Sequence, residues 1–199
     1  LRKSVKQMID SGDLVMLKRN RIGVAEKLNL LVGKISIART GTRFVSRPGH
    51  DDDIVIPASE LYTSFDGDEV VVRLTTIREG RQQGTVIRVA KRVARNIVGI
   101  YRTSRTWQFV VPDNPKIHRD IYIAGENTLQ AIEGEKVVAV LEVWDDPYMN
   151  PEGKIIERLG PPNAPGVDML AVIRSFNFAV AFPAEVLTEA ETAAARLDE

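Results

Sequence analysis

The chain contains no cysteine and only two histidines, His50 and His118, among its 199 residues. The absence of cysteine excludes disulfide bonds, thiolate catalysis and every cysteine-based zinc site. Two histidines leave few members for a histidine metal site or a serine–histidine triad. No apolar stretch approaches the roughly 20 residues that cross a bilayer, because charged residues, asparagines or glycines interrupt each one. We therefore expect no membrane partner and little catalytic material.

The charge of the chain sums to zero but is unevenly distributed. Residues 1–92 hold 17 basic and 11 acidic residues, whereas residues 93–199 hold 10 and 16. A basic first half suits a polyanionic partner, although an ordinary solvated surface also produces such unevenness. No charged segment followed by an apolar one occurs near the first residue, so we expect a cytoplasmic location.

Five short blocks recur in the same order at a spacing of 65 to 69 residues. Each block is rich in β-branched residues and bounded by Gly, Pro, Asn or Asp, which is typical of strands. The matching pairs are 32–35 with 98–101, 43–45 with 108–110, 53–56 with 120–123, 65–72 with 132–139, and 84–89 with 153–158. The chain therefore contains a duplicated unit of about five strands.

Five strands in about 60 residues are too few for a sandwich, whereas a closed barrel hides its edges within that length. We predict a mainly β protein with two tandem five-stranded barrels of the oligonucleotide/oligosaccharide-binding (OB) type, at residues 32–92 and 93–162. Gly67 and Gly134 are expected in corresponding turns, because glycine adopts positive φ without steric cost.

The segments outside the repeats have helical patterns. Residues 4–11 predict a helix, and residues 14–17 with 22–24 predict a hairpin, so 1–31 is interpreted as the end of a winged-helix-like unit. Residues 163–199 are interpreted as a linker followed by short helices at 168–176 and 184–197.

The order of these features, with the segments 28–33, 165–168 and 182–187, resembles the amino-terminal part of the ribonuclease R branch of the ribonuclease II family. These enzymes are processive 3′-to-5′ exoribonucleases. The resemblance implies two cold-shock-like OB domains ahead of a large catalytic domain, whose aspartate cluster holds magnesium. That domain is missing from this chain, so we predict no catalytic residue, no metal site and no cofactor here. We expect the chain to be inactive alone.

One local carboxylate cluster, Asp51, Asp52 and Asp53, precedes the third strand of the first repeat. Only Asp53 has a counterpart in the second repeat, Asp120, so a polar loop is the simpler interpretation and a metal site the alternative. His118 lies in the next repeat's corresponding loop, and we expect it to be solvated or to contact phosphate.

Cold-shock barrels bind single strands by stacking bases on exposed aromatic side chains while basic residues contact phosphates. If Val110 and the Ile121–Ile123 strand turn inward, then Trp107, Phe109 and Tyr122 share the outer face. The alternative is that one of these rings packs beneath a loop. The basic residues expected to contact phosphate in this repeat are Arg102, Arg105, Lys116 and Arg119.

The first repeat has Thr42, Phe44 and Val55 at the equivalent positions. With one aromatic ring, it predicts weak stacking and binding mainly by charge. The basic residues are Lys34, Arg39, Arg43 and Arg47 in the repeat, and Arg88, Lys91, Arg92 and Arg95 toward the next one. Ordinary surface charge is the alternative.

Two functions remain open at this point. In the first, the chain binds single-stranded RNA without sequence specificity and guides it to the catalytic domain of its parent chain. In the second, the barrels are a protein-interaction or substrate-gating module with little RNA affinity of their own.

Overall fold

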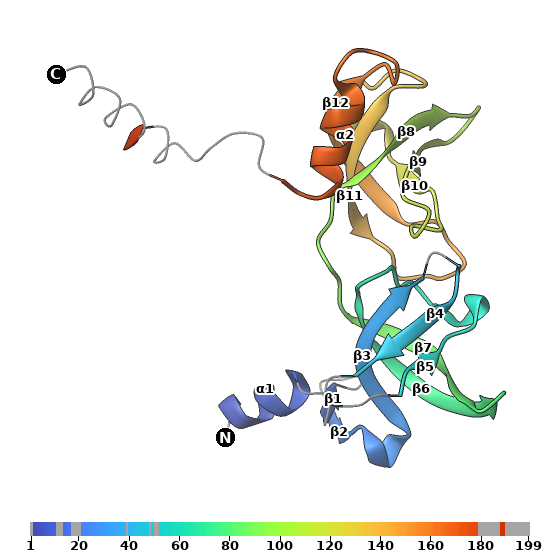
Figure 1. Cartoon of the computed structure of the whole chain (residues 1–199). Helices are drawn as coiled ribbons and strands as arrows, with labels where there is room; N and C mark the ends of the chain where they lie inside the picture. The colour runs from blue at the N-terminus through green and yellow to red at the C-terminus, as the bar shows by residue number, and fades with distance from the viewer. Residues whose placement is uncertain are drawn as a thin grey trace.

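The computed structural model describes residues 2–10, 14–16, 21–38, 40–47, 49, 52–178 and 188–189. It contains two closed five-stranded barrels stacked along the chain (Figure 1). The first is formed by β3 (Leu30–Ile37), β4 (Arg43–Ser46), β5 (Ile54–Val55), β6 (Glu69–Arg78) and β7 (Arg81–Lys91). The second is formed by β8 (Ile97–Thr103), β9 (Gln108–Pro112), β10 (Ile121–Ile123), β11 (Lys136–Val143) and β12 (Glu152–Gly160). The mainly β class and the tandem five-stranded barrels are confirmed.

The two barrels have the same topology. In each, the third strand pairs in parallel with the fifth, and the other strand pairs are antiparallel. A single helical turn follows the third strand in both, η3 (Ala58–Glu60) and η4 (Gly125–Asn127). The internal repeat of the sequence is therefore a repeat of the whole strand order.

Equivalent glycines allow the strands to approach closely enough to close each barrel. A Cβ atom on Gly33 would lie 2.5 Å from the Ser46 carbonyl oxygen, and one on the equivalent Gly99 would lie 2.2 Å from the Val111 carbonyl oxygen. No real side chain tolerates such a contact, so these positions require glycine. Around them, each barrel is filled by inward-facing aliphatic side chains, among them Ile35, Val45, Ile54 and Val70 in the first, and Val110, Ile121, Val137 and Ile155 in the second.

The turn before the fourth strand follows the same design in both barrels. Gly67 has φ +87° and Gly134 has φ +88°, in the left-handed region that glycine adopts most easily. Each turn donates a backbone N–H to the first strand, from Gly67 to the Ile35 carbonyl and from Gly134 to the Tyr101 carbonyl. The predicted correspondence of the two turns is confirmed.

Different elements cover the same outer face of the two barrels. The hairpin of β1 (Leu14–Met16) and β2 (Ile22–Val24) packs on the first barrel, where Val15 contacts the outward-facing Val71. On the second barrel, α2 (Val167–Ser175) takes that place, with Ala171 against Val138. The chain also has α1 (Arg2–Asp10) and η2 (Glu26–Leu28).

The helix expected at 168–176 is thus present as α2, whereas the one expected at 184–197 lies outside the described residues. Neither covering element lies over β4 and β5 or over β9 and β10, which are drawn on the right of Figure 1. The β1–β2 hairpin and α2 therefore leave the outer faces of these four strands uncovered.

Candidate nucleic-acid interface

A continuous row of side chains crosses the outer face of the second barrel, one residue from each strand. Arg102 on β8 pairs with Phe109 on β9, Phe109 with Tyr122 on β10, Tyr122 with Glu152 on β12, and Glu152 with Val143 on β11. Residues that pair across a sheet point to the same side. The register therefore places two aromatic rings at the centre of this row, which we call the outer row.

Trp107 joins the outer row from the turn between β8 and β9. Its ring centroid lies 5.2 Å from that of Tyr122, with the rings edge to face at 72°. The Trp107 side chain is 56% exposed, so it does not pack beneath a loop. Phe109 and Tyr122 are partly exposed, and Val110, Ile121 and Ile123 are buried inside the barrel. The three aromatic residues thus lie together on the face that strand alternation indicates.

The first barrel repeats the outer row with different chemistry. Ser36, Phe44, Val55 and Gln83 pair in succession across β3, β4, β5 and β7. The face is hollowed by a groove of about 750 Å³, lined by Thr42, Phe44, Val55 and residues of the β6–β7 hairpin such as Ile77 and Arg81. A single ring lies in this groove, which fits the expectation of weak stacking here.

Several of the basic residues expected to contact phosphate already have partners within the chain. Arg102 pairs with Glu133 at 3.2 Å, and Lys116 of the second barrel pairs with Asp66 of the first at 3.1 Å. Arg119 donates to the Pro147 carbonyl at 3.0 Å and Arg43 to the Gly41 carbonyl at 2.9 Å. Exposed ion pairs contribute little energy, so Arg102 and Lys116 can exchange these partners for phosphate.

The other basic residues differ in their availability. Lys34 and Arg105 have no ion pair among the described residues, and both are exposed. Arg47 buries its Nε atom without a partner among those residues. Arg39 lies outside the described residues. Arg105 stands two positions before Trp107 in the sequence. It is therefore a cation close to the aromatic rings that has no ion-pair partner among the described residues.

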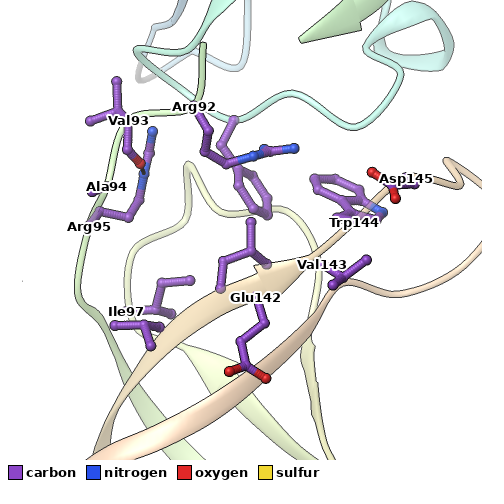
Figure 2. A pocket seen from close by; sticks show the side chains of 12 residues that line it. Arg92, Val93, Ala94, Arg95, Ile97, Glu142, Val143, Trp144 and Asp145 are labelled. Atoms are coloured by element: carbon purple, nitrogen blue, oxygen red, sulfur yellow. Dashed lines mark hydrogen bonds between the residues drawn. The ribbon is translucent and has the colours of Figure 1, made fainter. Parts of the chain in front are cut away.

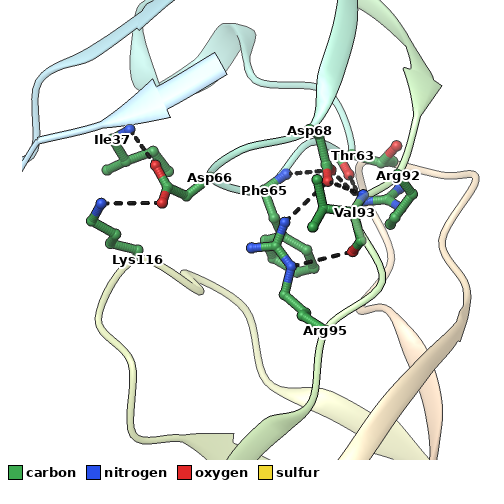
Figure 3. A network of polar contacts seen from close by, with 9 residues as sticks. All are labelled: Ile37, Thr63, Phe65, Asp66, Asp68, Arg92, Val93, Arg95 and Lys116. Carbon is green, nitrogen blue, oxygen red and sulfur yellow. Dashed lines mark hydrogen bonds and ion pairs between the residues drawn. The ribbon is translucent and has the colours of Figure 1, made fainter. Parts of the chain in front are cut away.

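The linker between the barrels is built around a buried carboxylate, which corrects the expectation of a basic track there (Figure 3). Asp68 is fully buried and accepts hydrogen bonds from Arg92 at 2.9 Å and from Arg95 at 3.1 Å. It also accepts the backbone N–H groups of Phe65 and Val93. A buried carboxylate is stable only when its oxygens are satisfied in this way. Arg92 and Arg95 therefore hold the linker in place rather than facing RNA.

Arg88 is also used internally, since it donates to the Met16 carbonyl at 3.0 Å. Lys91 keeps an exposed side chain. Among the described residues, Lys91 is therefore the one of the four linker cations whose side chain forms no hydrogen bond or ion pair within the fold.

An aromatic cluster joins the two barrels at the same place. Phe65 of the first barrel is 1% exposed and packs into the core of the second, with its ring centroid 4.6 Å from that of Trp144. The Arg92 guanidinium lies 5.8 Å from the Phe65 ring and 5.7 Å from the Trp144 ring. Figure 2 labels Arg92 and Trp144 among the side chains that line a cavity of about 440 Å³ between the linker and the end of β11.

His118 lies at the edge of this cluster and remains exposed to solvent, as expected. Its ring contacts Phe65 and Trp144, with centroids at 5.6 and 6.0 Å. Burial lowers the pKa of His118, and the positive charges of Arg119 and Arg43 lower it further. The imidazole is therefore neutral near pH 7, which removes the charge that a phosphate contact would use.

Burial also lowers the pKa of Arg92, while the charge of Asp68 opposes this shift. In the second barrel, hydrogen bonds from Thr103 lower the pKa of Glu133, so this carboxylate stays ionised beside Arg102. These shifts belong to groups that hold turns and barrels together. None of them marks an acid or base placed for catalysis.

Sequence reasoning missed Phe65, Asp68 and Trp144, the residues that fix one barrel on the other. Phe65 stands at the repeat position of Ile132, which is 62% exposed, so the repeat pattern gives no signal of its burial. For Asp68, a signal was present: an acidic residue follows glycine in both repeats, and Glu135 likewise accepts a backbone N–H, from Ile132 at 2.9 Å.

The acidic residues before β5 are the carboxylates that the sequence offers as an alternative metal site. Asp52 and Asp53 are exposed, and Asp51 lies outside the described residues. In the part of the chain that the structure describes, no three His, Cys, Asp or Glu side chains come together to hold a metal ion. Within that same part, no helix is both long and apolar enough to cross a membrane.

Comparisons with known proteins agree with this architecture. The Ribonuclease B OB domain family matches residues 33–89, and the Cold shock domain family matches residues 109–183. Ribonuclease R of Thermotoga maritima is 33% identical over 99% of this chain and 28% of its own length. Ribonuclease R of Escherichia coli is 29% identical over 94% of this chain and 23% of its own length. The chain thus spans about a quarter of these two relatives.

Solved structures show the same fold. The Mycoplasma genitalium RNase R in complex with ribose methylated single-stranded RNA superimposes with a TM-score of 0.72, at 18% identity, over 81% of this chain and 26% of that one. Yeast Ssd1, described as a pseudonuclease, superimposes with a TM-score of 0.66, at 16% identity, over 89% of this chain and 26% of that one. Since one of these proteins is a nuclease and the other a pseudonuclease, the fold alone does not determine RNA cleavage.

Two closed barrels with an exposed aromatic row define a tandem OB-fold chain of the cold-shock class. Within that class, the relatives and the two matching domains establish a narrower assignment. The chain corresponds to the tandem OB-domain region of the ribonuclease R family.

Proposed function

We propose that this chain is the RNA-binding segment of a 3′-to-5′ exoribonuclease. It would bind single-stranded RNA without sequence specificity and guide it to a catalytic domain elsewhere in its parent chain. The observation that carries this proposal is the outer row of the second barrel, where the exposed Trp107 lies together with the partly exposed Phe109 and Tyr122. Aromatic side chains arranged in this way stack on bases of any sequence.

The surrounding charges support the same proposal. Arg105 is free of ion pairs among the described residues, and Arg102 and Lys116 are held by pairs that are partly exposed. Phosphates can therefore be contacted on the flank of the rings without breaking a buried interaction. For the parent enzyme, the proposal also includes cleavage of RNA with magnesium and a cytoplasmic location.

A second function, a protein-interaction or substrate-gating module, is favoured by the first barrel. Its outer row contains a single ring, Phe44, and the linker cations Arg92 and Arg95 are engaged with Asp68. Under this alternative, the chain alone has little affinity for RNA.

Titration of a fluorescently labelled single-stranded RNA, followed by anisotropy at several salt concentrations, tests the two functions. We expect weak binding that falls with salt, with a log–log slope of about −0.7 for each phosphate contacted. A double-stranded RNA of the same length is the control and should bind less well, because its bases are not free to stack on the rings. Absence of salt-dependent binding to the single strand would favour the gating module.

A further inference from the structure

The outer row of the second barrel contains an acidic residue next to its aromatic rings. Glu152 begins β12 and pairs in parallel with Tyr122, so the two side chains point to the same side of adjacent strands. Neighbouring strands lie about 4.8 Å apart. The Glu152 carboxylate is exposed and has no polar partner among the described residues.

This position is unusual for a surface that binds a polyanion. A carboxylate repels phosphates, so the sugar–phosphate backbone is expected to pass on the other flank of the rings, where Arg105 and Arg102 lie. A base stacked on Tyr122 then directs its hydrogen-bonding edge toward Glu152. Single-stranded RNA leaves these edges free for recognition.

An ionised carboxylate only accepts hydrogen bonds, so it distinguishes bases by the donors on their edges. Guanine presents two adjacent N–H groups, which match the two oxygens of a carboxylate in a bidentate pair. Cytosine and adenine present one amino group. Uracil presents one N–H between two carbonyl oxygens, and these oxygens are repelled by a carboxylate.

The first barrel has neither an aromatic ring nor a carboxylate at the two equivalent positions. Its equivalent of Tyr122 is Val55, and its equivalent of Glu152 is Gln83, which both donates and accepts hydrogen bonds. At this paired position a carboxylate is therefore present in the second barrel alone, whereas Asp52 and Asp53 line the groove around Phe44 from the loop before β5.

We propose that Glu152 gives the second barrel a preference for guanine at the base stacked on Tyr122. This inference rests on the proposed function and deepens it, since stacking alone treats all bases alike. The preference concerns one position along a strand whose other contacts remain indifferent to sequence.

The test compares three labelled RNA octamers by anisotropy: alternating uridine and guanosine, alternating uridine and inosine, and uridine alone. Inosine differs from guanosine by the loss of one amino group, so it keeps the stacking surface and loses one of the two donors. For the parental chain we expect the guanosine octamer to bind about fivefold or more tightly than the inosine octamer, in line with about 1–3 kcal/mol for a bidentate base contact.

Glu152→Gln removes the charge with little change of shape, and we expect it to bring the guanosine and inosine octamers within about twofold of each other. The matched control is Asp168→Asn, which removes one exposed carboxylate from α2, outside the outer row, and should keep the parental ratio. Circular dichroism of both variants verifies that the barrels are intact.

The outcomes separate the two proposals. If the parental chain binds all octamers equally, or if Glu152→Gln keeps the guanosine preference, the role of Glu152 is wrong while RNA binding stands. If none of the octamers binds, the proposed function itself is wrong, and the role of Glu152 with it.

Discussion

Trp107, Phe109 and Tyr122 are three aromatic residues that lie together on one face of the second barrel. Trp107 meets Tyr122 edge to face, an arrangement that holds both rings in place and leaves ring surface exposed for a base. Phe109 is the cross-strand neighbour of Tyr122. The rings therefore hold one another in place, and under the proposed function this order reduces the entropy lost on binding RNA.

We predict that alanine at each of these three positions weakens binding of single-stranded RNA by about 1–3 kcal/mol, because a stacking partner of a base is lost. Thr42→Ala and Val55→Ala in the first barrel are the matched controls and should have almost no effect. Anisotropy titration of the five variants measures this. If none of the five changes weakens binding of single-stranded RNA, the result would support the interaction-module alternative.

At the scale of elements, the turns before β6 and β11 combine glycine with two acidic residues in the same way. Asp66 accepts the backbone N–H of Ile37 at 2.7 Å, and its counterpart Glu133 accepts that of Thr103. The acid after the glycine accepts the N–H three residues earlier in both turns, Phe65 to Asp68 and Ile132 to Glu135. Each turn thus satisfies backbone donors that the strands leave unpaired.

The residue that precedes this turn is buried in one barrel and exposed in the other. Phe65 is buried in the core of the second barrel, whereas Ile132 is largely exposed. The difference arises because the turn of the first barrel faces its neighbour, and the described residues place no third barrel against the turn of the second.

We predict that Phe65→Ala lowers the free energy of unfolding by about 3–5 kcal/mol, as expected for a buried phenylalanine. Ile132→Ala should change it by less than about 0.5 kcal/mol. Urea denaturation followed by tryptophan fluorescence measures both, since Trp144 contacts Phe65 directly. A small effect of Phe65→Ala would show that the barrels do not depend on this contact for stability.

At the scale of the whole molecule, the barrels are joined through Asp68, the aromatic cluster and two further polar contacts. Lys116 reaches Asp66, and the Tyr62 hydroxyl donates to the Asp145 carbonyl at 2.8 Å. These contacts connect the turn and the end of β11 on either side of the linker. The two outer rows are therefore held in a fixed relation, so a strand bound to one barrel meets the other in a set orientation.

We predict that the purified chain binds single-stranded RNA and leaves it uncut in magnesium or manganese. Two-metal hydrolysis needs several carboxylates converging on one point, and the described residues contain no such group. Gel electrophoresis of a 5′-labelled RNA measures this, with a ribonuclease R of full length as the positive control. Magnesium-dependent shortening from the 3′ end would direct attention to Asp51, Asp52 and Asp53.

Much of the architecture followed from local chemistry in the sequence. The period of the repeat, the glycine turns and the alternation of side chains fix two barrels and place Trp107, Phe109 and Tyr122 on one face, because these features depend on neighbouring residues and strand geometry. Helix signals located α2 for the same reason.

The tertiary structure decided which basic, aromatic and acidic side chains face solvent and which hold the two barrels together. Arg92 and Arg95 belong to a group of basic residues that the sequence predicts to contact phosphate, yet both pair with the buried Asp68. Phe65 occupies the repeat position of an exposed isoleucine and nevertheless fills a core. Glu152 lies opposite Tyr122 through a parallel strand pair that joins residues 30 positions apart. Such contacts depend on the packing of distant segments, and no local pattern in the sequence records that packing.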